Sequence, residues 1–113
     1  MIQMPLAPQE YEKQVTAAKR DFEVLLGKHG IPKEHQPAFK GVLEKAANEF
    51  GAKGSSMTQE AFNIRVTTFH GMVRQKLGAI GIKSKPAYDR AEHEFCQLIT
   101  RLAGRLRWGG MEK

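Results

Sequence analysis

The chain has 113 residues, of which 41% are hydrophobic, and it carries a formal net charge of +6. A chain of this length has room for one domain with one core, which can fold without disulfides or metals. The single cysteine, Cys96, excludes an internal disulfide, and no apolar run approaches the roughly 20 residues that span a bilayer. The N-terminus lacks the basic and apolar parts of a signal peptide. We therefore expect a soluble, cytoplasmic protein that does not contact a membrane.

The positive charge is concentrated in the second half of the chain. Residues 1–56 hold eight Lys or Arg and seven Asp or Glu, whereas residues 57–113 hold ten and five, so the excess is +1 against +5. Residues 61–88 contain no acid at all. Such asymmetry points to a polyanionic partner, although a mildly basic chain also gains solubility from its charge alone.

The first helix is predicted over residues 9–29. Before it, residues 1–8 are expected to form an extended, flexible arm, because Pro5 and Pro8 disfavour helix in the residues that precede them. From residue 9 onward, apolar residues recur at spacings of four and three, which places them on one helical stripe. The stripe consists of Tyr11, Val15, Ala18, Phe22 and Leu25. Gly30 suits the left-handed conformation that ends helices, and Pro32 prevents continuation.

The second helix is predicted from about Pro37, a residue well tolerated in a first helical turn, to about Gly51. An alternative is that this helix begins at Pro32 and is kinked at Pro37. Its apolar stripe consists of Phe39, Val42, Leu43, Ala46 and Phe50.

The third helix is predicted to begin at about Met57. Ser56 and Gln59 match a capping box, in which a hydroxyl and a side-chain amide bond the free N–H groups of a helix start. The apolar stripe that follows consists of Phe62, Val66, Phe69, Val73 and Leu77, with Ile80 at its margin. Gly78 and Gly81 are both suited to end this helix.

The fourth helix is predicted to begin after Ser84, a candidate N-cap, and to end at about Trp108. Its apolar stripe consists of Tyr88, Ala91, Phe95, Leu98, Leu102 and Leu106, with Ile99 beside them. Short loops join the helices. The sequence therefore predicts an all-α fold, a single small domain with a bundle of about four helices over residues 9–108 and a flexible tail over residues 109–113.

A polar strip on the third helix is a candidate for contact with DNA bases. At 100° per residue, one side of this helix presents Asn63, Thr67, His70 and Arg74. Asn pairs with adenine and Arg with guanine, although any solvated helix face also carries polar residues. The second and third helices further suggest a helix-turn-helix, with Ala47 at the helix crossing and Gly51 at the turn.

Basic residues of the third and fourth helices are candidates for contact with phosphates. They are Arg65, Arg74, Lys76, Lys83, Lys85, Arg101, Arg105 and Arg107. Trp108 joins them, because an exposed indole can stack on an unpaired base. The alternatives are that Trp108 covers the end of the bundle, and that cations at a helix C-terminus complement the helix dipole.

A carboxylate, an imidazole and a thiol lie close together on the fourth helix, at Asp89, His93 and Cys96. Nucleophilic catalysis also needs an oxyanion hole, and Glu92 and Glu94 would raise the thiol pKa rather than lower it. No pair of histidines and cysteines has the spacing of a standard zinc site. We therefore expect no enzyme activity, no metal site and no cofactor.

Two functions compete. The first is a small nucleic-acid-binding accessory or regulatory protein, with DNA favoured over RNA, whose third and fourth helices make one cationic surface. The second is a helical protein-protein interaction module, such as an adaptor, inhibitor or homodimer, in which apolar stripes are partly left open for a partner. The first predicts that Arg74, Lys83, Arg101 and Arg105 share one face of the folded domain.

Overall fold

The computed structural model describes residues 8–108, apart from the side chains of Pro8, Ser55 and Trp108. This part of the chain forms the helices α1 (Pro8–Lys28), α2 (Gln36–Lys53), α3 (Gln59–Ile80) and α4 (Lys85–Trp108). Two short 3-10 turns, η1 (Lys33–His35) and η2 (Gly54–Ser56), lie before and after α2. The predicted all-α bundle is confirmed. The predicted arm and tail lie outside the described residues, except that Pro8 opens α1.

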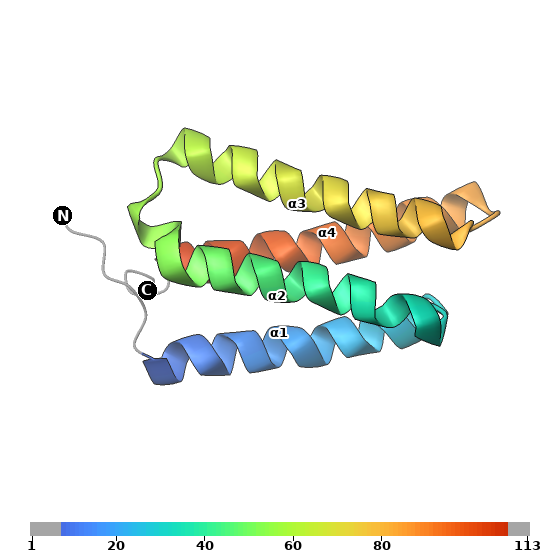
Figure 1. The fold of residues 1–113 in the computed structure, drawn as a ribbon, viewed down its shortest axis with the longest axis horizontal. Helices are drawn as coiled ribbons and strands as arrows, with labels where there is room; N and C mark the ends of the chain where they lie inside the picture. The colour runs from blue at the N-terminus through green and yellow to red at the C-terminus, as the bar shows by residue number, and fades with distance from the viewer. Residues whose placement is uncertain (1–7, 109–113) are drawn as a thin grey trace.

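Helix α4 is the central element of the bundle. It packs against each of the other three helices, and α1 and α3 lie on either side of the α2–α4 pair (Figure 1). Three seams therefore run along α4, and those with α1 and α3 lie on either side of the one with α2. No helix within residues 8–108 is long and apolar enough to cross a membrane.

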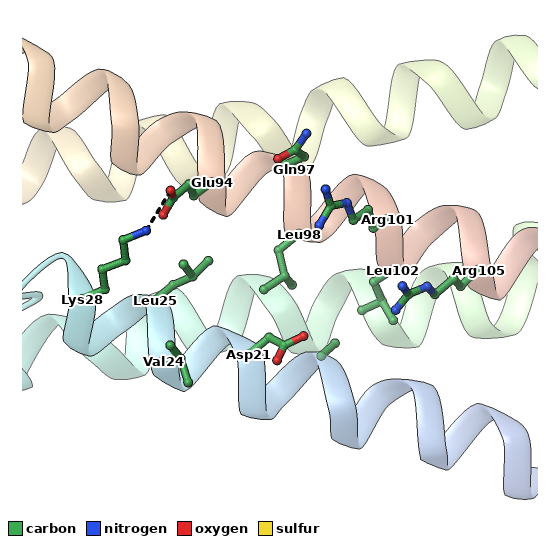
Figure 2. Close-up of a pocket in the computed structure, with 11 residues that line it drawn as sticks. Asp21, Val24, Leu25, Lys28, Glu94, Gln97, Leu98, Arg101, Leu102 and Arg105 are labelled. Carbon is green, nitrogen blue, oxygen red and sulfur yellow. Dashed lines mark hydrogen bonds and ion pairs between the residues drawn. The ribbon is translucent and has the colours of Figure 1, made fainter.

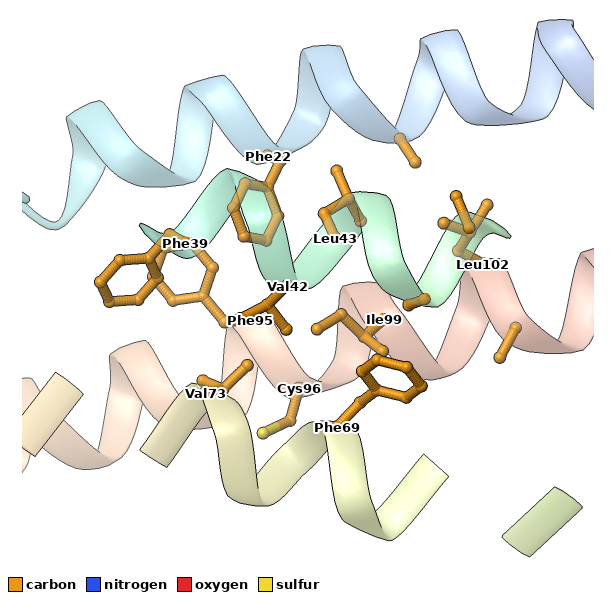
Figure 3. Packing of buried hydrophobic residues seen from close by; sticks show 14 of the residues in the cluster. Phe22, Phe39, Val42, Leu43, Phe69, Val73, Phe95, Cys96, Ile99 and Leu102 are labelled. Carbon is orange, nitrogen blue, oxygen red and sulfur yellow. The ribbon is translucent and has the colours of Figure 1, made fainter. Parts of the chain in front are cut away.

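A cluster of phenylalanine rings holds the four helices together. The Phe95 ring of α4 lies 5.1 Å from the ring of Phe22 and 5.3 Å from that of Phe39, measured between centroids (Figure 3). Farther along the bundle, the Phe50 ring of α2 lies 5.6 Å from the Phe69 ring of α3. Burying each such side chain contributes about 1.5–3 kcal/mol. Contacts between rings of different helices therefore determine how the apolar faces of the four helices pack against one another.

The predicted core positions are buried throughout α2 and α3, apart from the marginal Ile80. In α1 the structure buries the predicted Ala18 and Phe22 and also Leu26, whereas the predicted Tyr11, Val15 and Leu25 are only half-buried. In α4, Tyr88 and Leu98 of the predicted stripe are half-buried, and Ala103 joins the core. The pattern of spacings thus found the buried side of each helix, and its half-buried members on α1 and α4 pack against the core cluster.

Two predicted helix ends are confirmed by the backbone. Gly30 and Gly81 have φ values of 63° and 77°, the left-handed conformation that glycine adopts without strain. Ser84 caps α4, since its hydroxyl oxygen accepts a hydrogen bond of 3.3 Å from the Ala87 N–H. Helix α2 begins at Gln36, so Pro37 lies in its first turn and the alternative start at Pro32 is wrong.

Two other predicted ends are wrong. The N-cap of α3 is Thr58, whose hydroxyl accepts a hydrogen bond of 3.0 Å from the Ala61 N–H. Ser56 instead donates its hydroxyl to the Lys53 carbonyl, 3.0 Å away, so the predicted capping box does not form. Helix α2 continues past Gly51, where a Cβ atom would lie 2.2 Å from Cε1 of Tyr11. Gly51 therefore serves close packing inside the helix rather than its end.

Candidate functional site

The predicted base-reading strip of α3 lies along its seam with α4. Asn63 and Thr67 are exposed, but His70 Nε2 lies 2.7 Å from the Thr100 hydroxyl of α4. The Thr100 hydroxyl donates its proton to the Cys96 carbonyl, so its oxygen accepts the bond from His70. Burial, reinforced by the charge of Arg74, lowers the pKa of His70. His70 therefore connects two helices as a neutral imidazole at neutral pH.

The predicted helix-turn-helix is wrong at its turn. Gly51 lies within α2, and the helices α2 and α3 run side by side in opposite directions (Figure 1). Ala47 is buried, and its carbonyl accepts a hydrogen bond of 3.2 Å from the Tyr11 hydroxyl of α1. These two small residues of α2 thus receive the Tyr11 side chain.

Three of the predicted phosphate contacts are already paired with carboxylates. Arg65 donates two hydrogen bonds to Glu49 of α2, at 2.5 and 2.8 Å. Arg74 forms an ion pair with Glu92 of α4. Lys85 lies 3.2 Å from Asp89, one turn later in α4. Because each charge is matched locally, these residues add little to a cationic surface.

Arg107 is placed differently from the prediction. Only 4% of this residue is exposed, and its Nη1 donates hydrogen bonds of 2.7 Å to the carbonyl oxygens of Gly54 and Met57. Its guanidinium also lies 4.9 Å from the centre of the Phe62 ring. Arg107 therefore holds the connection between α2 and α3 against the end of α4, and does not face solvent. The predicted role of Trp108 falls on a side chain outside the described set.

The remaining predicted cations have no ion pair or hydrogen bond among residues 8–108; they are Lys76, Lys83, Arg101 and Arg105. They lie in two places. Lys83 precedes α4, whereas Arg101 is 16 residues into that helix, a rise of about 24 Å. The cations that the sequence predicted on one surface are thus divided between the two ends of the bundle.

A groove of about 400 Å³ runs along the seam between α1 and α4 (Figure 2). Leu25, Leu98 and Leu102 point into it from the two helices, and Val24 stands at its edge with 62% of its surface exposed. The complete lining is Ala18, Asp21, Val24, Leu25, Lys28, Glu94, Gln97, Leu98, Arg101, Leu102 and Arg105. The groove therefore has an apolar floor and charged edges.

The two ends of this groove differ in charge. At one end, Glu94 accepts hydrogen bonds from His29 Nε2 at 2.8 Å and from Lys28 Nζ at 3.0 Å. Bonding to His29, and secondarily to Lys28, lowers the pKa of Glu94. At the other end, the exposed guanidinium groups of Arg101 and Arg105 have no partner within the described chain. Within the described lining, the cations without an ion pair therefore lie at the Arg101 end of the groove.

A second groove, of about 380 Å³, lies at the seam between α3 and α4, where Asp89, His93 and Cys96 meet His70 and Arg74. Cys96 is buried, and that burial raises its thiol pKa to about 11. The thiol is therefore protonated at neutral pH and is a poor nucleophile. Within residues 8–108, no group of three or more His, Cys, Asp or Glu side chains could hold a metal ion.

The contribution of α1 to a site was missed by reasoning from sequence. Asp21, Val24 and Lys28 belong to no motif, and each reads as an ordinary residue of a solvated helix face. The breadth of the apolar face around Leu98 was a usable signal, because a stripe wider than its neighbours can cover leaves part of itself open. No family model, curated protein or solved structure matches this chain.

Proposed function

We propose that this protein is a helical protein-interaction module, and that its groove between α1 and α4 binds a segment of a partner protein. The observation that carries the proposal is the half-open apolar floor of that groove. Leu25 and Leu98 of the floor are only half-buried, and Val24 at the edge of the groove is 62% exposed. Covering these side chains would remove apolar surface from water, which is the main driving force of protein association.

An amphipathic helix is the partner element that suits this site best. Two parallel ridges with a groove between them are the surface into which a third helix packs its apolar stripe. The groove of about 400 Å³ holds side chains rather than a whole backbone, as in helix-helix packing. Its charged edges supply the polar rim that surrounds the apolar core of an interface.

Nucleic acid is the second candidate, supported by the unpaired Arg101 and Arg105. Two observations favour protein binding over nucleic-acid binding. The other predicted cations without a partner in the described chain, Lys76 and Lys83, are far from this pair, and phosphate binding gains its strength from many cations acting together. The lining of the groove contains no aromatic ring on which a base could stack.

Selection from a displayed library of amphipathic helical peptides tests the proposal. We expect the selected peptides to share an apolar stripe and to bind Val24→Glu at least about tenfold more weakly, because a buried unpaired charge opposes binding. Ile64→Glu is a matched control, since Ile64 is 58% exposed on α3, away from the groove. It should bind as the wild type does.

Three results would overturn the proposal. One is a set of selected peptides that bind Val24→Glu and wild type equally. Another is tight, salt-dependent binding to duplex or single-stranded probes that Val24→Glu leaves unchanged and that Arg101→Glu with Arg105→Glu abolishes. The third is a dimer in solution that Val24→Glu dissociates, because the groove would then be covered by a second copy of the chain.

A further inference from the structure

We infer that the bound segment is a helix carrying two acidic residues one turn apart, which pair with Arg101 and Arg105. The inference rests on the function proposed above and adds the charge pattern of the partner. It also adds an orientation: the acidic edge of the partner helix faces α4, and a basic residue on its other edge faces Asp21 of α1.

The spacing of the two arginines supports the pair of acidic residues proposed for the bound helix. Arg101 and Arg105 are four residues apart on α4, so their Cα atoms are separated by about 6 Å along the helix axis. Acidic residues at positions i and i+4 of a helix lying along the groove repeat the same spacing. Each guanidinium presents a planar fork that matches a carboxylate, and neither has a partner within residues 8–108 that would have to be displaced.

The opposite wall of the groove supports the proposed orientation of the bound helix. Asp21 projects from α1 toward the side of α4 that carries Leu98 and Arg101, yet it forms no ion pair within the described chain (Figure 2). A carboxylate and a guanidinium that face one groove from two sides without pairing leave both charges for a ligand. A basic residue beside Asp21 therefore fixes which edge of the partner helix faces α1.

A second copy of this chain is a poorer occupant on the same grounds. The groove lining carries Lys28, Arg101 and Arg105 against Asp21 and Glu94, and Glu94 is already bonded to Lys28. Two identical grooves would bring matching cations into one interface, and like charges at an interface cost free energy. An acidic helix replaces that repulsion with attraction.

Three synthetic peptides of about 18 residues, long enough to hold helix, test the inference. They share one apolar stripe and differ only at two edge positions one turn apart, which carry Glu, Gln or Lys. Fluorescence anisotropy at low salt should find the Glu peptide about 3- to 10-fold tighter than the Gln peptide, the gain typical of two ion pairs at an interface edge. The Lys peptide should be the weakest.

Substitutions in the protein should change the order of affinity of the three peptides. Arg101→Gln with Arg105→Gln should bind the Glu and Gln peptides equally, and Arg101→Glu with Arg105→Glu should prefer the Lys peptide. Lys76→Gln with Lys83→Gln removes two free cations away from the groove and should keep the wild-type order. All the side chains replaced are outside the buried core, and circular dichroism checks that each variant is folded.

The result also separates this inference from the proposed function. If the Gln peptide binds and Val24→Glu weakens it, but the Glu peptide is no tighter, the groove binds helices and the inference is wrong. The inference is equally overturned if Arg101→Gln with Arg105→Gln retains the wild-type order. If none of the three peptides binds, the proposed function itself fails, and the charge pattern fails with it.

Discussion

Arg107 and Gly54, 53 positions apart in the chain, are joined by a hydrogen bond of 2.7 Å from the guanidinium Nη1 to the Gly54 carbonyl oxygen. The same nitrogen donates to the Met57 carbonyl at 2.7 Å. Gly54 is the first residue of η2, the turn between α2 and α3, and Met57 directly follows that turn. A single cation at the end of α4 therefore supplies the polar partners that the backbone of this turn needs.

Arg107→Met should destabilise the protein by about 2–4 kcal/mol, because methionine keeps much of the volume but leaves carbonyl groups without their charged donor. The free energy of unfolding in urea measures the loss. Arg105→Met is the control on the same helix, since Arg105 is exposed and bonded to no described residue. It should change stability by no more than about 0.5 kcal/mol. Equal losses in the two variants would contradict the structural role of Arg107.

Gly51→Ala should destabilise the protein by about 1–2 kcal/mol, although alanine is the better helix former. The added Cβ would lie 2.2 Å from Cε1 of Tyr11, so the ring must move and its hydrogen bond to Ala47 is lost. Gly41→Ala, in the same helix but with nothing within 4 Å of the new Cβ, should instead stabilise by about 0.5–1 kcal/mol.

A double-mutant cycle isolates the contact with Tyr11. In a Tyr11→Ala background, Gly51→Ala should become stabilising by about 0.5–1 kcal/mol, because only the helix propensity remains. Thermal or urea unfolding of the four proteins measures the coupling. An unchanged sign in that background would mean that the cost of Gly51→Ala arises elsewhere.

The ion pairs at Glu94 should make stability depend on pH in the acid range. Hydrogen bonds from His29 and Lys28 lower the pKa of Glu94 below its ordinary value of 4.5. A carboxylate with a lowered folded pKa contributes stability that is fully present above pH 4.5 and is lost as pH falls through the folded pKa. Glu94→Gln should therefore lose less free energy of unfolding than wild type as the pH falls below 4.5.

Glu44→Gln is the control for that measurement, since Glu44 is exposed and forms no ion pair within residues 8–108. Its curve of stability against pH should run parallel to that of the wild type. If the curve for Glu94→Gln also runs parallel to that of the wild type, the hydrogen bonds from His29 and Lys28 do not favour the charged form of the Glu94 carboxyl, and the prediction is wrong.

Cys96 should react slowly with alkylating reagents in the folded protein. Burial raises its pKa from 9.0 to about 11, which reduces the thiolate fraction at neutral pH by roughly 100-fold. Iodoacetamide labelling followed by mass spectrometry should show rapid modification in urea and slow modification in buffer. Equal rates in the two conditions would contradict both the burial and the raised pKa.

The local features of this protein follow from sequence because their causes lie within a few residues. Five apolar residues at spacings of four and three on α3, from Phe62 to Leu77, are all buried, since a period of 3.6 permits only one such face. Gly30 and Gly81 end helices because only glycine adopts a positive φ without cost. Capping was harder to predict, because the capping-box pattern pointed to Ser56 and only the turn between the helices places Thr58 at the start of α3.

The candidate site depended on contacts between distant segments. The sequence indicated that Arg101, Arg105 and Arg107 form a cationic end to the last helix, and α4 does end with these three residues in its last turns. Only tertiary packing buries Arg107 beneath the turn at Gly54, and only packing sets α1 beside α4 to make the second wall of a groove. Helical period and turn chemistry are local and can be read from neighbouring residues. The pairing of each charge and the exposure of each apolar side chain instead depend on which residues of another helix pack against it.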